Sequence, residues 1–201
     1  MSEKMMDLFP TPLFITNIND AIDKKLKEYL ISMPKIINMG NLRSEDGYVL
    51  NQPVFSELKV LIMQSIEEYI QTIYGNEKLD VYITQSWVNY TNPGEFHHKH
   101  THPNSFISGV FYINAIGGED MIKFSKPRSS MFDIFTPVRN NYNSNDVCIM
   151  VETGDLLLFP SLFEHEVPTT TSKETRISIA FNTFIRGFIG SQERASALYL
   201  H

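Results

Sequence analysis

The stretch Arg176-Ile-Ser-Ile-Ala-Phe-Asn182 alternates polar or small side chains with large apolar ones. Successive side chains of a β-strand point to opposite faces, so this stretch predicts a strand with one polar and one apolar face. If the apolar face packs against helices, the polar face lines a cavity inside a barrel. A half-exposed strand with a solvated polar face gives the same pattern, so other parts of the chain must distinguish the two.

Short strands with the same period of two are predicted from Leu79 onward. Turn-forming residues such as Asn92-Pro-Gly94 and Gly117-Gly118 separate them. Residues 127–144 are polar enough to form a long loop, and the segment Lys126-Pro-Arg128 is either an ordinary solvated loop or a lid over a site. The stretches with strand character are 81–90, 108–114, 121–124, 146–151, 155–159 and 176–182.

Two amphipathic helices are predicted before these strands. After a short edge strand interrupted by prolines at residues 9–15, Asn19-Asp20 can cap a first helix that ends near Met33-Pro34. A second helix runs from about Val54 to Tyr74 and is closed by Gly75-Asn76. Many short strands after two helices favour a mainly β fold, a sandwich or barrel buttressed on one side by helices.

The composition indicates a globular protein of 201 residues, with 42% hydrophobic and 20% charged residues. We expect a single domain, with helical support at 1–78, a barrel core at 79–185 and a C-terminal tail at 186–201. The net charge of −6 and the scattered basic residues argue against direct nucleic-acid binding. The sequence shows no long apolar run of the kind that forms a signal peptide or a membrane span. We therefore expect a cytoplasmic location by default. Cys148, the single cysteine, is predicted to be a buried strand residue.

Four of the six histidines lie in the stretch His97-His-Lys-His-Thr-His102. If residues 98–102 are extended, every second side chain shares a face, so His98/His100 and His100/His102 are both candidate ligand pairs, with His97 pointing the other way. Imidazole ligands favour transition metals over calcium or magnesium. Solvated surface histidines are the alternative.

His165 offers a third ligand, because it follows a predicted strand and a tight turn. A site made of residues so far apart in sequence suits a sheet better than a zinc finger. On the polar face of the last strand, Arg176 can donate two hydrogen bonds to one carboxylate, with Ser178 beside it.

These motifs together resemble the iron(II)- and 2-oxoglutarate-dependent oxygenases. The resemblance covers roughly residues 85–185, and it is strongest to short oxygenases of marine bacteria and phages that carry His-x-His-Pro before Ser-Gly-Val-Tyr-Tyr. The segments that carry it are His100-Thr-His102, Ser108-Gly-Val-Phe-Tyr112, Gly154-Asp-Leu-Leu-Leu-Phe-Pro-Ser161, His165 and Arg176-Ile-Ser178.

The resemblance implies a double-stranded β-helix, which is a jelly-roll, cupin-like barrel, with the two helices packed on its major sheet. Most members of the superfamily have a carboxylate where this chain has His102. With three neutral ligands, the metal site would be more positive and less electron-rich than a site with one carboxylate ligand. If His102 does not bind, then His98, water or a cosubstrate oxygen takes its place. The implied ligands are His100, His102 and His165 for iron, and Arg176, Ser178 and Tyr112 for 2-oxoglutarate.

The implied activity is a hydroxylation coupled to decarboxylation of 2-oxoglutarate to succinate, with Fe(II), 2-oxoglutarate and O2 as cofactors and a small molecule or peptide as substrate. Candidate substrate contacts are Asn89, Asn104 and Asn182. Trp87 is expected in the core instead. The sequence leaves open whether the protein forms a homodimer. One alternative is a three-histidine cupin-type dioxygenase without a cosubstrate, which leaves Arg176 without a role. Another is a noncatalytic jelly-roll binding or assembly module with a structural metal or none.

Overall fold

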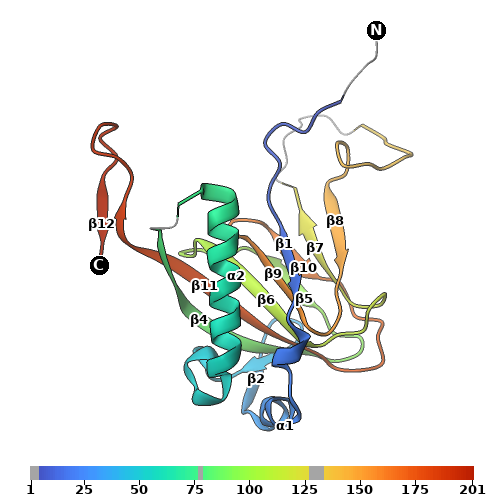
Figure 1. Ribbon diagram of the computed structural model, residues 1–201. Helices are drawn as coiled ribbons and strands as arrows, with labels where there is room; N and C mark the ends of the chain where they lie inside the picture. The colour runs from blue at the N-terminus through green and yellow to red at the C-terminus, as the bar shows by residue number, and fades with distance from the viewer. Residues whose placement is uncertain (1–4, 77–78, 127–133) are drawn as a thin grey trace.

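The computed structural model describes residues 5–76, 79–126 and 134–201, and two antiparallel sheets organise this part of the chain (Figure 1). The larger sheet has the order β1-β9-β6-β11-β4-β3-β2, with β12 paired to β11, and the smaller has the order β5-β10-β7-β8. The strands are β1 (Phe14–Asn17), β2 (Lys35–Ile37), β3 (Leu42–Ser44), β4 (Asp80–Thr91), β5 (His97–His100), β6 (Ile107–Asn114), β7 (Met121–Ser125), β8 (Asp146–Met150), β9 (Asp155–Pro160), β10 (His165–Val167), β11 (Arg176–Ile189) and β12 (Leu198–Leu200).

The two predicted helices are present as α1 (Lys24–Ser32) and α2 (Ser56–Tyr74). Helix α2 ends where predicted, because Gly75 adopts a left-handed conformation with φ of 58° and its N–H donates to the Gln71 carbonyl. The predicted cap of α1 at Asn19-Asp20 is wrong. The side chain of Asp23 caps this helix by accepting from the Leu26 N–H at 2.7 Å, and Asn19–Ala21 forms a separate short 3₁₀ turn. Further 3₁₀ turns span Val49–Asn51 and Pro53–Phe55.

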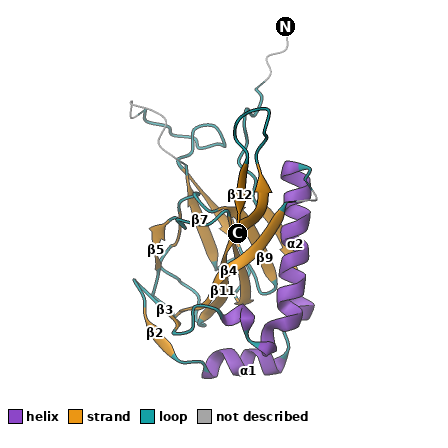
Figure 2. Cartoon of the chain, turned by 90° about the vertical axis from the view of Figure 1, so that its left-hand side faces the viewer, coloured by secondary structure: helices purple, strands orange, loops and turns teal. Residues whose placement is uncertain are grey.

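Both helices pack on one face of the large sheet (Figure 2). The apolar face of β11 contributes Ile177, Ile179 and Phe181 to this core, as the alternation predicts. Other members of this cluster are Leu30 of α1, Ile62 and Ile66 of α2, Tyr90 of β4, Phe111 of β6 and Leu158 of β9.

A second apolar cluster fills the space between the sheets. Val110, Leu157 and Phe159 come from the large sheet, and Ile122 and Phe124 come from the small one. The rings of Phe124 and Phe159 meet edge to face with centroids 5.0 Å apart. The two sheets with this shared interior form the double-stranded β-helix expected from the sequence.

The six predicted strands are present within a few residues, and the remaining strands are short or displaced. The predicted edge strand begins only at Phe14, past the prolines. The extended segment considered for residues 98–102 is instead strand β5, which ends at His100. The tail is partly structured because β11 extends to Ile189 and pairs with β12. Strands β2, β3, β10 and β12 have three residues each, too few for a visible periodicity.

Two smaller predictions have different outcomes. Cys148 is exposed, not buried, because β8 is an edge strand of the small sheet and Cys148 lies on its solvent side. Residues 134–145 contain no helix or strand, in agreement with the predicted long loop. The segment Lys126-Pro-Arg128, expected as either a solvated loop or a lid, falls mostly on residues outside the described part of the chain.

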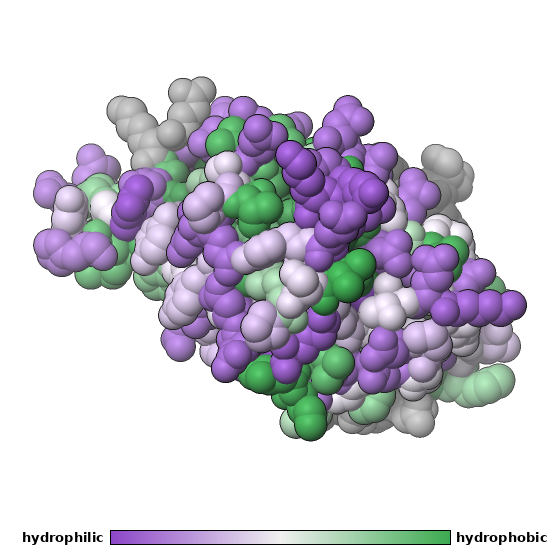
Figure 3. Space-filling view, turned by 90° about the horizontal axis from the view of Figure 1, so that it is seen from below, coloured by the Kyte–Doolittle hydropathy of each residue, from purple (hydrophilic) through white to green (hydrophobic). Residues whose placement is uncertain are grey.

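The surface seen in Figure 3 carries apolar residues in small separate groups among hydrophilic ones. None of the helices in the described ranges is long and apolar enough to cross a membrane.

The approach of β11 to its neighbours depends on Gly109 of β6, which pairs with Phe181 and Leu158. A Cβ at Gly109 would lie 2.2 Å from Phe181 Cζ and 2.8 Å from Leu158 Cδ2. We expect Gly109→Ala to lower the free energy of unfolding by about 1–3 kcal/mol, because overpacking displaces a buried ring. Urea unfolding measures this change as a lower midpoint at an unchanged m-value.

Gly47→Ala is the matched control, since a Cβ there meets no atom within 4 Å. Its unfolding midpoint should stay close to that of the native protein. Equal midpoints for the two variants would contradict the packing assigned to Gly109.

Candidate metal centre

Three histidines converge at one end of the barrel. His100 ends β5, His102 lies two residues beyond this strand, and His165 begins β10 directly opposite His100. One ligand nitrogen from each lies within 4.8 Å of the others, and His102 Nε2 is 3.3 Å from His165 Nε2. His102 and His165 are 8% and 6% exposed. The sequence-predicted triad is therefore brought together as a cluster with metal-ligand spacing, in which His102 and His165 are buried and His100 is partly buried.

The backbone fixes which nitrogen each of two rings presents. His100 Nδ1 lies 2.7 Å from the His98 carbonyl, and His165 Nδ1 lies 2.9 Å from the Phe163 carbonyl. A carbonyl only accepts, so both Nδ1 atoms donate, and each Nε2 keeps its lone pair for a metal.

The cluster also favours neutral rings. Burial lowers the pKa of His102 to about 3 and that of His165 to about 4, since a charged imidazolium loses solvation there. Neutral imidazole is the form that coordinates metals.

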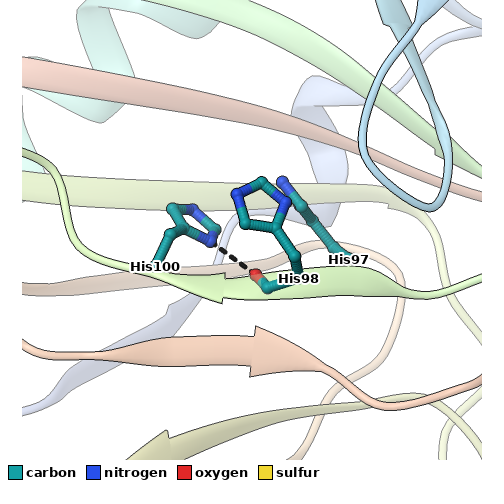
Figure 4. Close-up of side chains that lie close together, drawn as sticks. All are labelled: His97, His98 and His100. Atoms are coloured by element: carbon teal, nitrogen blue, oxygen red, sulfur yellow. Dashed lines mark hydrogen bonds between the residues drawn. The ribbon is translucent and has the colours of Figure 1, made fainter.

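The first two histidines of the motif also approach this centre. His97, His98 and His100 form a second group with ligand atoms within 4.8 Å of one another, and their rings project from the same side of β5 (Figure 4). The His97 ring stacks on that of His100 with centroids 4.6 Å apart. The prediction that His97 points away from His100 is therefore wrong.

A β-bulge causes this difference. His165 pairs with His100 while Val167 pairs with His97, so the two strands lose register between these pairs. An extra residue in one strand rotates the side chains before it relative to those after it. The simple alternation assumed for an extended segment therefore fails at His98.

A polar row crosses the inner face of the large sheet. In register, Arg43 of β3 faces Asn89 of β4, Asn89 faces Ser178 of β11, and Ser178 faces Tyr112 of β6. Directly opposed residues share a face, so the row points into the barrel. Arg176 lies two residues before Ser178 on the same face, as the alternation of β11 predicts.

Arg176 is the most informative member of this interior. It is 3% exposed, and its guanidinium carbon lies 4.8 Å from the centre of the Tyr112 ring. Its Nε and the Tyr112 hydroxyl are both buried without a hydrogen-bond partner, and no carboxylate of the described residues pairs with the guanidinium. Burial raises the pKa of Tyr112, so its hydroxyl keeps its proton. A buried unpaired cation beside a free donor fits an anionic ligand.

A cavity of about 360 Å³ opens onto the histidines. His97, His100 and His102 line it together with Trp87 and Gln85 of β4. Trp87 was expected in the core, but it is only partly buried, and its ring centre lies 5.8 Å from that of His102. The inner face of β4 places Trp87 opposite the small Ala180, which leaves the indole free to line the cavity.

The three candidate substrate residues lie in different settings. Asn89 is buried in the polar row, and its Oδ1 has no partner. Asn182 accepts from Ser108 Oγ at 3.0 Å and donates to Gln85 Oε1 at 3.3 Å, which places it behind a cavity-lining residue. Asn104 is exposed on the turn after His102 with φ of 59° and does not line this cavity.

Comparison with known proteins supplies a family. Residues 85–182 match the sequence model of the family described as "Putative 2OG-Fe(II) oxygenase". No curated protein matches the chain.

Several solved structures have a similar fold, among them HygX, SnoN and a prolyl-4-hydroxylase. HygX from Streptomyces hygroscopicus, with nickel, 2-oxoglutarate and hygromycin B bound, has a TM-score of 0.62 at 10% identity over 94% of this chain and 92% of that one. The α-ketoglutarate-dependent epimerase SnoN from nogalamycin biosynthesis has a TM-score of 0.61 at 11% identity, over 95% and 82%. A Pseudomonas putida prolyl-4-hydroxylase has a TM-score of 0.58 at 16% identity, over 88% and 94%.

At these identities the similarity establishes the double-stranded β-helix over most of the chain. The family match covers the segment that holds the histidine triad, Tyr112, Arg176 and Ser178. Residues 85–182 of this chain are thus similar to the family of putative 2OG-Fe(II) oxygenases.

Proposed function

We propose that the protein is an iron(II)- and 2-oxoglutarate-dependent dioxygenase that hydroxylates a small-molecule or peptide substrate. The observation that carries this proposal is the buried guanidinium of Arg176, which has no carboxylate partner among the described residues and lies on the inner face of the barrel that holds the histidines. An unpaired buried charge is costly, and a ligand carboxylate removes that cost.

His100, His102 and His165 are the proposed iron ligands. They come from two strands and the segment that follows β5, and two of them have their Nδ1 atoms held by carbonyls. The competing group, His97, His98 and His100, comes from a single strand, and His98 Nδ1 is buried without a partner. Two rings of the first group have Nδ1 held by a carbonyl, but only His100 does in the second, and preorganised ligands hold a metal better, which favours the first group.

Arg176 is the proposed anchor for the distal carboxylate of 2-oxoglutarate. Its planar fork matches a carboxylate with two parallel hydrogen bonds, and the Tyr112 hydroxyl and Ser178 lie on the same inner face to complete the site. This end of the cosubstrate would be fixed while its 2-oxo acid end faces the histidines.

Bound iron with 2-oxoglutarate and O2 supplies the oxidising chemistry, in which 2-oxoglutarate is converted to succinate and CO2 and the substrate gains an oxygen atom. The chain itself orients the reactants and excludes water. Phe159 packs against His165 with ring centroids 4.9 Å apart, and Phe124 does so at 5.8 Å. These rings give the centre an apolar wall.

The two alternatives explain fewer of these features. A three-histidine dioxygenase without a cosubstrate and a noncatalytic binding module both leave the unpaired Arg176 guanidinium without a role. Within the oxygenases, hydroxylation is distinguished from epimerisation by the product, because only hydroxylation adds one oxygen atom to the substrate.

The metal ligands can be tested by substitution with Ni²⁺ as the probe. We expect His165→Ala and His102→Ala to weaken Ni²⁺ binding at least about 100-fold, because each removes one of three ligands. His102→Asp should retain binding, since a carboxylate is an equivalent ligand. Isothermal titration calorimetry measures these affinities.

His97→Ala is the control for the competing group of histidines. It should change Ni²⁺ affinity less than about three-fold, because its ring lies outside the proposed triad. Loss of binding in His97→Ala with retention in His102→Ala would instead assign the metal to His97, His98 and His100.

The cosubstrate site can be tested through stability. At 100 times its Kd, 2-oxoglutarate should stabilise the Ni²⁺-loaded native protein by about 2.7 kcal/mol, seen as a higher Tm. In Arg176→Met this increase should disappear, whereas Ser178→Ala should retain most of it, because it removes only one neutral hydrogen bond. Without ligand, Arg176→Met should be as stable as the native protein or more so, since an unpaired buried charge is removed.

Arg194→Gln removes an exposed positive charge outside the site and should leave the effect of 2-oxoglutarate unchanged. If 2-oxoglutarate fails to stabilise the native protein, or stabilises Arg176→Met equally, the proposed function is wrong.

A further inference from the structure

A second guanidinium lies in the metal-side cavity and has no role in the proposed mechanism. Arg43 of β3 lines the cavity together with His97, His100 and His102. Its register partner is Asn89, so it occupies the outer end of the inner polar row, and Tyr112 occupies the other end. The neighbouring Leu42 packs in the helix-side core, which fixes Arg43 on the barrel side.

The charge of Arg43 is not balanced by the described residues around it. Its Nη1 donates to the Ser44 carbonyl at 2.9 Å, which orients the side chain but leaves most of its donors free. The carboxylate of nearby Asp46 accepts from the Tyr48 N–H and the Gln52 amide instead. No described carboxylate forms an ion pair with Arg43, and none lines the cavity.

Flat apolar surfaces lie around this cation. Trp87 is partly buried and Tyr48 is 54% exposed, and both line the same cavity. Rings of this kind bind planar or apolar groups through their faces. The cavity therefore combines one guanidinium fork with aromatic walls next to the proposed metal ligands.

We propose that Arg43 is a specificity-determining residue and that the substrate is a small molecule with a carboxylate or phosphate group joined to an aromatic or other flat apolar group. Arg43 binds the anionic group, and Trp87 and Tyr48 contact the apolar part. This inference rests on the proposed function, because it assigns Arg176 to the cosubstrate and thereby leaves Arg43 to the substrate.

The single tryptophan of the chain gives a direct measurement, because Trp87 lines the cavity and is the only source of tryptophan emission. The protein is loaded with Zn²⁺ and 2-oxoglutarate and titrated with phenylacetate, phenyl phosphate and phenylacetamide. Phenylacetamide is the neutral match of phenylacetate. We expect at least one anion to bind about ten-fold more tightly than the amide, and the stronger anion identifies the preferred group.

Variants assign the preference to Arg43. Arg43→Gln should bind all three probes with similar affinity, Arg43→Lys should retain part of the preference because it keeps the charge without the fork, and Arg194→Gln should retain all of it. A native protein that binds the amide as tightly as both anions would overturn the proposal. So would an Arg43→Gln variant that keeps the full anion preference.

Binding of 2-oxoglutarate to the same samples separates the two proposals. Arg43→Gln should bind 2-oxoglutarate within two-fold of the native protein, which also shows that the variant is folded. Loss of 2-oxoglutarate binding in Arg43→Gln would make Arg43 a cosubstrate anchor and overturn the assignment to the substrate. If the native protein binds the anions through Arg43 but does not bind 2-oxoglutarate, the proposed function fails while the anion site stands.

Discussion

The register of β11 between β4 and β6 is the constraint on which both faces of the large sheet depend. It places Ile179 and Phe181 against the helices and Arg176 and Ser178 inside the barrel. A slip by one residue would bury the polar set under α2 and turn the isoleucines toward the metal centre, so the register is strongly specified. The core and the candidate site are therefore two consequences of one pairing. Gly109 belongs to the same constraint, because only a residue without Cβ lets Phe181 occupy its place.

The barrel interior combines two kinds of environment with opposite energetic roles. Toward the small sheet, Phe124, Phe159 and Leu157 form a packed apolar cluster that stabilises the fold. Beside this cluster, on the inner face of the large sheet, unpaired donors such as Arg176 Nε and the Tyr112 hydroxyl are buried and cost stability in the absence of a ligand. Such groups are tolerated where binding needs them, because a ligand that pairs them recovers the cost.

Elements with a long, regular pattern could be predicted from sequence, whereas those defined by tertiary pairing could not. The alternation of β11 and the period of α2 are visible in the sequence itself. They were enough to predict the barrel, its helical support and the inward position of Arg176. The three-residue strand β3 has too few positions to show a pattern, and it carries Arg43, which no sequence signal distinguished. The bulge in β5 depends on pairing with β10, so the approach of His97 to His100 was predictable only with the partner strand known.

The charge of the proposed active site explains why anions dominate its expected ligands. The proposed ligands and anchors comprise three neutral imidazoles and two guanidiniums, and no carboxylate of the described residues lines the cavity. An aspartate at the position of His102 would cancel one charge of a divalent metal, and the histidine leaves it uncancelled. A divalent metal with both guanidiniums therefore carries four positive charges, and a dianionic cosubstrate balances only two of them. The remaining charge favours a second anion, and Arg43 is the cation that lines the cavity, among the described residues, and stays free to bind it.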